Sequence, residues 1–341
     1  MVSFVIPTLN SAATLGECLD SILAQDVPRD GYEIVIADGG STDATLDIAR
    51  SKGVDVVCAN PLKTAEAGKA AGIEKSKGDF IALVDSDNIL PSRGWLAAMM
   101  RPFADPEIFA SEPVRYSARQ DDPPLTRYFA LLGMNDPICL FAGNYDRICV
   151  VTGKWTGLDV PSERKDGYMK IRPHGEMPTI GANGFIFRRS MLDKVEWKPY
   201  FFDIDAAAAA VAAGCGAIAK TDESIVHLYC ARFAAFASKQ RRRICDYLYF
   251  SRNKGRTYPW KRRGAVAIAL FCASIATFVP VAAQALAFAL RAPRGDRRLA
   301  WLHIPACYAT FWIYARQTIA KWSGAKPRMA DRANWQAAPR R

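Results

Sequence analysis

Short apolar runs alternate with helix-like patterns along the first hundred residues of the chain. Four of these runs have the length and composition of buried strands, and they cover residues 4–6, 33–37, 54–58 and 80–84. After the first run, apolar positions recur at helical spacing from Leu15 to Leu23, and either Asn10 or Ser11 is suited to cap that helix. Repeated strand-and-helix units predict a largely parallel sheet with short right-handed crossovers.

The pattern changes twice after residue 100. From about Pro123 to Arg172 it loosens into aromatic, Gly- and Pro-rich sequence, which predicts substrate-facing loops and one short helix. Strand-like residues return at 185–187. An alanine-rich helix follows at 206–213, with Gly214 placed to end it in the left-handed conformation.

Beyond residue 230 the chain is basic and apolar. Residues 232–249 form a basic, aromatic-bearing helical pattern, and the 27 residues from Gly264 to Leu290 carry no charge, which is long enough to cross a hydrocarbon core. A second uncharged run of 17 residues, at 299–315, contains Trp and Tyr side chains of the kind found at lipid headgroups. We therefore predict two hydrophobic membrane helices, and two buried core helices are the alternative interpretation.

Charge is divided unevenly between the two parts of the chain. Residues 1–230 hold 23 Lys and Arg against 31 Asp and Glu, whereas residues 231–341 hold 22 against 3. A basic region of this kind suits a polyanion, either nucleic acid or an anionic membrane face. Nucleic acid does not explain the uncharged runs, so the expected partner is an anionic membrane surface, and basic clusters flank the first run accordingly. They contain Lys261, Arg262, Arg263, Arg291, Arg294, Arg297 and Arg298.

The arginines from Arg291 to Arg298 also bear on how the two runs meet a membrane. If both runs crossed the bilayer, these arginines would lie on the outer side, against the usual bias of Lys and Arg toward the cytoplasm. A shallow or re-entrant pair keeps every basic cluster on the cytoplasmic face. We therefore favour a monotopic arrangement over a spanning hairpin, with the rest of the chain in the cytoplasm.

The nine cysteines are scattered along the chain without a Cys-x-x-Cys pair. An odd number without paired spacing argues against a disulfide scaffold or a zinc module and for reduced thiols. The chain starts directly with the strand residues Val2 to Ile6, so we expect no cleavable signal before the fold. The glycine-rich signatures of dehydrogenases and P-loop enzymes are missing, which sets those two classes aside.

Two aspartates follow the fourth apolar run. Asp85 and Asp87 lie one residue apart where a buried strand should end. Ligands of open α/β sheets bind outside the carboxyl ends of strands, and such a pair can meet one hard cation and the phosphate oxygens that the cation bridges. The pair therefore predicts a site for Mn²⁺ or Mg²⁺ and a nucleotide diphosphate, with Asp85 placed to meet both.

Three motifs stand in order along the first hundred residues. They are Val-Ile-Pro-Thr-Leu-Asn at 5–10, Ile-Ala-Asp-Gly-Gly-Ser-Thr-Asp at 36–43, and Lys-Gly-Asp with Val-Asp-Ser-Asp within 77–87. Together they resemble the family 2 glycosyltransferases of GT-A fold. The resemblance implies a Rossmann-like α/β fold, with a mainly parallel sheet flanked by helices, to which this chain adds C-terminal membrane-associated helices.

The chain accordingly divides into four predicted segments. They are a GT-A catalytic domain at 1–230, a basic amphipathic juxtamembrane segment at 231–263, two hydrophobic helices at 264–321 and a basic tail at 322–341.

The family resemblance also implies roles in donor binding. Pro7, Thr8 and Asn10, at the end of the first strand, would border the nucleotide, and Asp38 would accept a hydrogen bond from its base. Lys69 occupies a position where the family often has a basic or amide residue near the diphosphate. A lysine at a helix start can help to neutralise phosphate, and a surface lysine on a solvated face is the alternative interpretation.

Inverting transfer of a sugar also needs a carboxylate that deprotonates the incoming hydroxyl. The segment Tyr-Phe-Phe-Asp-Ile-Asp at 200–205 resembles the acidic helix start that carries this base in the family, with Phe202 where many relatives have Glu. Asp203 and Asp205 are both candidates. The spacing to Gly214 favours Asp203, and Asp205 has a structural alternative as the cap of the following helix.

Three further positions are candidates through the same resemblance. His227 follows the last apparent core strand, where relatives often have a histidine near the metal, and a core histidine is the alternative. Asn183 and Gly184 lie in the region that lines the acceptor pocket in relatives, or they form a type I′ turn. Residues 240–243 resemble incompletely the Gln-x-x-Arg-Trp signature of processive members, because Ile244 replaces the tryptophan, and this argues against polymer synthesis.

These features predict a membrane-attached, metal-dependent inverting glycosyltransferase. It would move a sugar from a nucleotide-diphosphate donor to a lipid-linked or envelope glycan acceptor, without nucleic acid as a partner. One alternative makes polyprenyl phosphate itself the acceptor, in which case no base is needed. An alternative from another class is a catalytically idle scaffold that binds nucleotide sugars, although a sensor would not need a base. The identity of the donor sugar does not follow from these patterns.

Overall fold

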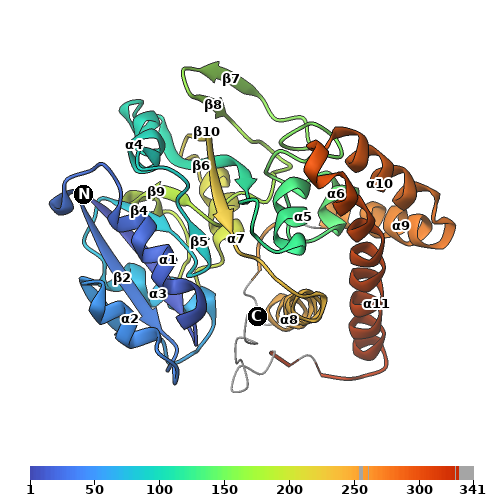
Figure 1. Cartoon of the computed structure of the whole chain (residues 1–341), viewed down its shortest axis with the longest axis horizontal. Helices are drawn as coiled ribbons and strands as arrows, with labels where there is room; N and C mark the ends of the chain where they lie inside the picture. Colours follow the sequence, from blue (N-terminus) through green and yellow to red (C-terminus); the bar gives the residue numbers. More distant parts are fainter. Residues whose placement is uncertain (253–255, 260, 327, 330–341) are drawn as a thin grey trace. The chain divides into compact units, whose positions relative to one another are not determined.

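The computed structural model describes residues 1–252, 256–259, 261–326 and 328–329 (Figure 1). These residues form two compact units, of which the first contains residues 1–114 and 160–227. The second unit contains residues 115–159 and the described residues from 228 onward. The inserted stretch 115–159 thus packs with the C-terminal helices, whereas the sequence-based division keeps it in the first domain. Most of the predicted basic tail lies outside the described residues.

Four parallel strands form one half of the sheet in the first unit. They are β1 (Val2–Thr8), β2 (Tyr32–Asp38), β3 (Val56–Ala59) and β4 (Phe80–Leu83). β1 pairs with β2 and β4, and β3 pairs with β2. Every residue of β1 and β2 is buried, as expected for strands that are covered on both faces. Each strand coincides with one of the four predicted apolar runs.

The other half of the sheet is antiparallel. It contains β5 (Asn88–Ile89), β6 (Ile108–Ser117), β7 (Ser162–Lys165), β8 (Tyr168–Ile171), β9 (Phe185–Arg188) and β10 (Ala217–His227). The strand order is β3-β2-β1-β4-β9-β6-β10-β8-β7, with β5 paired to β10. β9 runs antiparallel to both β4 and β6, so the sheet is mixed rather than mainly parallel.

Helices of the first unit flank this sheet. They are α1 (Ala12–Leu23), α2 (Thr45–Ser51), α3 (Ala65–Lys75), α4 (Trp95–Met100) and α7 (Asp203–Ala212), with short 3₁₀ turns η1 (Arg29–Gly31), η2 (Arg101–Ala104) and η3 (Arg189–Asp193). α3 lies close against β1, because a Cβ atom on Gly72 would come within 2.6 Å of Val5 Cγ1. One on Gly68 would come within 2.7 Å of Pro7 Cβ, so both positions require glycine.

The helix α7 starts earlier than its alanine-rich pattern predicts. Its first residue is Asp203 and its N-cap is Phe202, so Asp205 lies inside the first turn and is not the cap. Carboxylates in the first turn interact favourably with the positive end of the helix dipole. Gly214 follows the helix end with φ +75°, the left-handed conformation that the sequence predicts.

The second unit is helical. It contains α5 (Pro124–Leu132), α6 (Ile138–Ala142), α8 (Phe233–Arg252), α9 (Lys261–Thr277), α10 (Val279–Arg291), the 3₁₀ segment η4 (Arg294–Leu302) and α11 (His303–Trp322). Its core is aromatic, with Tyr128 stacked on Phe288 at 5.5 Å and Phe129 at 5.0 Å from Phe236 between ring centroids. The stretch that was predicted as loops with one short helix therefore holds two helices, and it also holds the β7–β8 hairpin.

The uncharged run 264–290 forms two helices instead of one. α9 ends at Thr277 and α10 begins at Val279, with Phe278 between them at φ +63°. Pro280 near the start of α10 has no N–H to continue the α9 hydrogen-bond ladder. The two helices are bent by 89°, and they are long and apolar enough for a membrane span only when taken together. No single helix within the described ranges is.

The incomplete processive signature has a structural use within the second unit. Gln240 Nε2 and Arg243 Nη1 donate hydrogen bonds to the Asn135 carbonyl at 2.7 and 3.0 Å. The Tyr314 hydroxyl donates to Gln240 Oε1 at 3.0 Å and to Asp136 Oδ2 at 2.5 Å. These contacts fasten α8 and α11 to the turn that precedes α6.

His303 predicts a pH dependence for the second unit. The imidazole is buried between the Tyr128 hydroxyl, 2.8 Å from Nδ1, and Gln284 Oε1, 2.9 Å from Nε2, and burial lowers the pKa of His303 to about 4. The unfolded chain binds this proton near pH 6.5, so the contribution to stability is complete above that pH and is lost as the pH falls toward 4. We expect the thermal midpoint to drop across this window.

The thermal midpoint should vary less with pH in His303→Gln, because glutamine keeps a polar side chain at this position but has no group that titrates. The matched control is His174→Gln, because the His174 side chain is exposed. If the thermal midpoint falls equally with pH in the wild type and in His303→Gln, His303 is not the group responsible.

Candidate active site

Asp38, at the end of β2, holds the loop that follows it. Its Oδ1 accepts hydrogen bonds from Thr8 Oγ1 at 2.9 Å and Ser41 Oγ at 2.6 Å. Its Oδ2 accepts from the backbone N–H groups of Gly40 at 2.9 Å and Ser41 at 2.8 Å. A carboxylate offers about four lone-pair positions, and these bonds occupy that number. Asp38 therefore shapes the loop directly, and a nucleotide base would share or replace one of these bonds.

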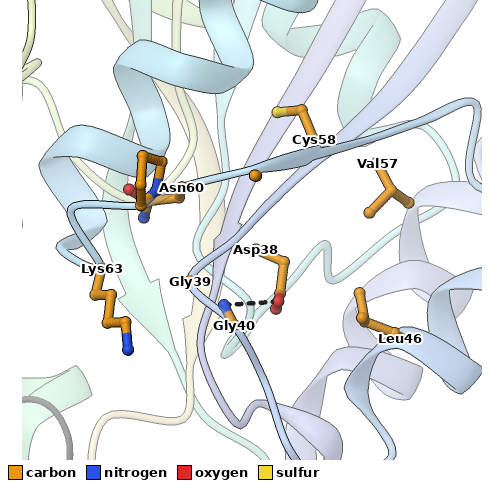
Figure 2. A pocket seen from close by; sticks show the side chains of 10 residues that line it. Asp38, Gly39, Gly40, Leu46, Val57, Cys58, Asn60 and Lys63 are labelled. Atoms are coloured by element: carbon orange, nitrogen blue, oxygen red, sulfur yellow. Dashed lines mark hydrogen bonds between the residues drawn. The ribbon is translucent and has the colours of Figure 1, made fainter.

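A cavity of about 420 Å³ opens beside Asp38 (Figure 2). It is lined by Asp38, Gly39, Gly40, Leu46, Val57, Cys58, Ala59, Asn60, Pro61 and Lys63. The walls are mostly apolar, with one carboxylate and one ammonium at the edge. This combination of volume, apolar lining and few polar groups is typical of a small-ligand site.

Residues predicted to border the nucleotide lie next to the Asp38 loop. Thr8 bonds Asp38 itself. Asn10 joins the loop by accepting from the Thr42 N–H at 2.9 Å and by donating its own N–H to Ser41 Oγ at 2.8 Å. Asn10 has φ +51°, which fits the tolerance of asparagine for the left-handed region. Pro7 is buried under α3. The structure thus brings these three residues and Asp38 together.

Lys69 joins the two acidic parts of the site. Its Nζ atom lies 2.6 Å from Asp203 Oδ2 and 3.8 Å from Asp85 Oδ1. The lysine is buried on the face of α3 that packs on the sheet, so the interpretation as a solvated surface lysine is wrong. The predicted base and the predicted metal ligand, which are far apart in the sequence, therefore meet through one ammonium group.

The electrostatics of this cluster are unbalanced toward negative charge. Burial acts to lower the pKa of Lys69, but the carboxylates of Asp203 and Asp85 outweigh burial and raise that pKa. Burial raises the pKa of Asp85, Lys69 opposes the rise, and Asp87 and Asp203 add to it. Two carboxylates thus contact one lysine, and Asp87 adds a further negative charge beside Asp85, which favours the binding of a further cation.

Asp87 and His227 lie together at the pairing of β5 with β10. His227 stands opposite Asn88 in this antiparallel pair, and its Nε2 lies 3.4 Å from Asp87 Oδ1. Residues 85–88 form a turn, called the acidic turn below, which Asn88 closes. Asn88 donates its N–H to the Asp85 carbonyl at 2.8 Å and accepts the Asp85 N–H at Oδ1 at 3.0 Å. The three predicted metal ligands therefore belong to one small region of the first unit.

The donor set of this region fits a divalent cation of the magnesium type. Within the described part of the chain no three His, Cys, Asp or Glu side chains are gathered to hold a metal ion by themselves. Mg²⁺ is usually held by one or two carboxylates together with substrate phosphates and water, not by a complete protein cage. Asp85 and Asp87 supply such carboxylates in an environment with excess negative charge, so the residues present fit Mg²⁺ or Mn²⁺.

The two candidate bases differ in their surroundings. The Asp203 side chain is 18% exposed and contacts Lys69, whereas Asp205 is buried and lies two residues further into α7. A base must come within hydrogen-bond reach of the proton that it removes. The geometry therefore favours Asp203, in agreement with the preference from the sequence.

Asn183 and Gly184 form a turn directly before β9, beside the end of β4. Both residues have positive φ angles, +53° and +88°, as the central pair of a type I′ turn requires. Asn183 is buried and its Oδ1 accepts a hydrogen bond from Asn88 Nδ2 at 3.0 Å, while the Gly184 N–H donates to the Leu83 carbonyl at 2.8 Å. The turn thus lies against the residue that closes the Asp85–Asn88 segment.

A buried ion pair is missing from the sequence-based set of site residues. Glu112 in β6 and Lys220 in β10 are fully buried, and Lys220 Nζ lies 2.5 Å from Glu112 Oε2. A signal was available, because each residue is a charge inside an apolar strand pattern. A charge at a buried position usually has a buried partner of opposite sign.

These features describe an α/β protein with its polar groups gathered at the carboxyl ends of β1, β2 and β4, where such sheets bind nucleotides. Residues 3–195 match the family described as Glycosyl transferase family 2. That is more than half of the chain, and the protein belongs to this family.

Two curated relatives share part of the chain. Glycosyltransferase AglE of Haloferax volcanii is 32% identical over 100 residues, which is 28% of this chain and 33% of the relative. The enzyme of Methanococcus voltae named dolichyl N-acetyl-alpha-D-glucosaminyl phosphate 3-beta-D-2,3-diacetamido-2,3-dideoxy-beta-D-glucuronosyltransferase is 33% identical over 89 residues, 24% of this chain and 27% of the relative. The match thus spans about a third or less of these proteins.

The fold is shared over most of the chain with a solved structure. The mannosyltransferase PcManGT from Pyrobaculum calidifontis, in complex with GDP-Man and Mn²⁺, aligns over 93% of this chain and 87% of its own, with 19% identity and a TM-score of 0.51. The predicted α/β class with flanking helices and the GT-A likeness are confirmed.

Proposed function

We propose that this protein is a metal-dependent inverting glycosyltransferase that moves a sugar from a nucleotide-diphosphate donor to a lipid-linked or envelope glycan acceptor. The observation that carries the proposal is the Asp203–Lys69–Asp85 cluster, in which a candidate base and a candidate metal ligand share one lysine. Membership of the family supports the reaction type. The Mn²⁺ and GDP-Man named for the archaeal mannosyltransferase support a divalent cation and a nucleotide sugar as ligands.

Each part of the site has a task in such a transfer. The cavity beside Asp38 receives the nucleoside, with the loop held by Asp38 forming one wall. Asp85 and Asp87 would hold the cation, which supplies positive charge against the diphosphate as its bond to the sugar breaks. Asp203 accepts the proton of the incoming hydroxyl, and Lys69 orients this carboxylate through its hydrogen bond.

The acceptor has two candidate chemistries. The name of the Methanococcus relative describes a sugar already linked to a dolichyl phosphate, which supports a lipid-linked sugar hydroxyl. The second candidate is polyprenyl phosphate itself. A phosphate acceptor is already ionised and needs no base, so Asp203→Asn separates the two: transfer to a hydroxyl requires Asp203, and transfer to a phosphate survives its loss and gives an acid-labile product.

The donor is identified by a panel of nucleotide sugars offered to the detergent-purified full chain. UDP-, GDP- and dTDP-sugars are supplied with Mn²⁺ or Mg²⁺, and release of the nucleoside diphosphate is measured. We expect turnover of one nucleotide class that depends on the metal. Binding without turnover, unaffected by Asp203→Asn even when membrane lipid extract is added, would favour the idle nucleotide-sugar scaffold.

We also propose that the second unit attaches the protein to the cytoplasmic face of a membrane. The observation behind this is a set of large apolar side chains exposed along α9, α10 and α11. Val279 and Leu290 are each 69% exposed and Trp322 is 79% exposed, and large exposed apolar patches mark sites of interaction with proteins or membranes. The exposed arginines from Arg291 to Arg298 follow directly and suit anionic headgroups.

The bend between α9 and α10 favours shallow insertion over a span. A pair bent by 89° returns toward the side it entered, so the basic groups at both ends of the pair can stay on one face. The bias of Lys and Arg toward the cytoplasm puts that face inside the cell. In intact cells an impermeant thiol reagent is expected to leave the protein unlabelled, and labelling would contradict this side.

Membrane attachment predicts a loss of vesicle binding when the exposed apolar residues are charged. We expect the wild type to co-sediment with phosphatidylcholine vesicles that contain about 30% phosphatidylglycerol. Leu286→Asp/Leu290→Asp should bind at least about tenfold more weakly, because burying each leucine side chain in the membrane contributes about 1.5–3 kcal/mol to binding. Leu62→Asp is the matched control, since Leu62 is 42% exposed in the first unit. Unchanged binding of the double variant would contradict the proposal.

A further inference from the structure

The ion pair between Glu112 and Lys220 is buried deep in the antiparallel half of the sheet. Both side chains are fully buried, and Lys220 Nζ lies 2.5 Å from Glu112 Oε2. Replacing a buried ion pair by apolar residues is often neutral or stabilising, so such a pair is weak evidence of a role in stability. Its contacts indicate a different role.

Glu112 uses its other oxygen to hold a glycine. Oε1 accepts a hydrogen bond from the Gly181 N–H at 2.9 Å. Gly181 has φ +136°, a conformation that only glycine adopts readily. A hydrogen bond from a backbone N–H to a carboxylate is charge-assisted and therefore strong. The loop that precedes β9 is thus tied to β6 at this residue.

Gly181 in turn contacts the backbone of Asp203. A Cβ atom on Gly181 would lie 2.6 Å from both the carbonyl carbon and the carbonyl oxygen of Asp203. Real Cβ atoms do not approach so closely, so the first turn of α7 rests directly on Gly181. The side chain of Asp203 is held from the other direction by Lys69, at 2.6 Å.

We propose that Glu112 and Lys220 are positioning residues that set the place of the Asp203 carboxylate through Gly181. Lys220 pairs with Glu112 and fixes its side chain, Glu112 fixes Gly181, and Gly181 supports the backbone from which the Asp203 side chain extends. The inference rests on the proposed function, in which Asp203 is the base. Small misplacements of a catalytic group are costly, and a shift of about 1 Å lowers rates by about a hundredfold.

The first test adds one methyl group at the contact. Gly181→Ala is expected to lower the rate constant of sugar transfer by about 10- to 100-fold, with KM for the nucleotide sugar changed less than about threefold, because the nucleoside cavity is built from other residues. Gly175→Ala is the matched control. Gly175 also has a positive φ, +75°, yet a Cβ there meets nothing within 4 Å, so the control carries the backbone strain without the contact.

The second test changes only the acceptor atom for the Gly181 N–H. Glu112→Gln/Lys220→Met and Glu112→Leu/Lys220→Met both remove the buried charges, and only the first keeps an oxygen at position 112. We expect the first double variant to stay within about threefold of wild-type kcat and the second to fall by about tenfold or more, at comparable nucleotide binding and thermal midpoint. Equal kcat in the two double variants would overturn the proposal. If the leucine variant does not fold, the result of Gly181→Ala decides.

Asp203→Asn separates this proposal from the proposed function. If Asp203→Asn retains transfer, the role of Asp203 as the base fails, and the positioning role fails with it. If Asp203→Asn loses transfer while Gly181→Ala keeps wild-type kcat, the base assignment stands and only the positioning role is overturned.

Discussion

Replacing Asp203 with asparagine is expected to lower the rate of sugar transfer by about a hundred- to ten-thousandfold, the usual contribution of a general base. Asparagine has the same shape, and its amide oxygen can still accept the hydrogen bond from Lys69, which lies 2.6 Å from Asp203 Oδ2. The variant therefore removes basicity with little change in geometry. Binding of the nucleotide sugar should stay within a few-fold of wild type, because Asp203 does not line the cavity beside Asp38.

Asp205→Asn is the control for this prediction. Asp205 lies in the same first turn of α7 but is buried. Transfer by Asp205→Asn should stay close to wild type, and the thermal midpoint is measured alongside to detect any structural cost. Loss of transfer in Asp205→Asn, with activity retained in Asp203→Asn, would contradict the account and identify Asp205 as the base.

Replacing Asp85 with alanine is expected to abolish metal-dependent donor turnover, with a fall of at least about a hundredfold at saturating Mn²⁺. Asp85 is the carboxylate of the acidic turn that also contacts Lys69, at 3.8 Å. Its loss removes a metal ligand and leaves Lys69 paired with Asp203. Turnover as a function of Mn²⁺ concentration, together with Mn²⁺ binding in the presence of the nucleotide, checks both effects.

Asp79→Ala is the matched control for Asp85→Ala. Asp79 precedes the same strand, at its opposite end, and its exposed side chain accepts a bond from the N-terminal amine at 3.1 Å. Turnover and Mn²⁺ dependence should be unchanged in this variant. Equal Mn²⁺ dependence in Asp85→Ala and the wild type would contradict a metal site at the acidic turn.

Local patterns were enough to predict the parallel half of the fold and much of the site. β1 to β4 follow apolar runs, of which β1 and β2 are buried along their whole length, and the turn after β4 carries Asp85 and Asp87 within three residues. The position of Gly214 after α7 was also predictable, since a single glycine ends the alanine pattern. In each case the determining residues are neighbours in the sequence.

Contacts between distant segments were not predictable in the same way. The approach of His227 to Asp87 depends on the pairing of β10 with the two-residue strand β5, and nothing in a short strand specifies its partner. The helices α5 and α6 are stabilised by a core shared with the C-terminal helices, so their own sequence reads as loop. The role of Lys69 also needed the fold, because the lysine lies between segments far apart in the chain.

The most direct test of the central claim is transfer of radiolabelled sugar from the donor found in the panel to membrane lipid extract. The wild type and Asp203→Asn are compared with and without Mn²⁺. We expect a labelled lipid product that needs both Mn²⁺ and Asp203, with donor binding intact in the variant. A product formed equally well without the metal, or equally well by Asp203→Asn, would contradict the proposed mechanism.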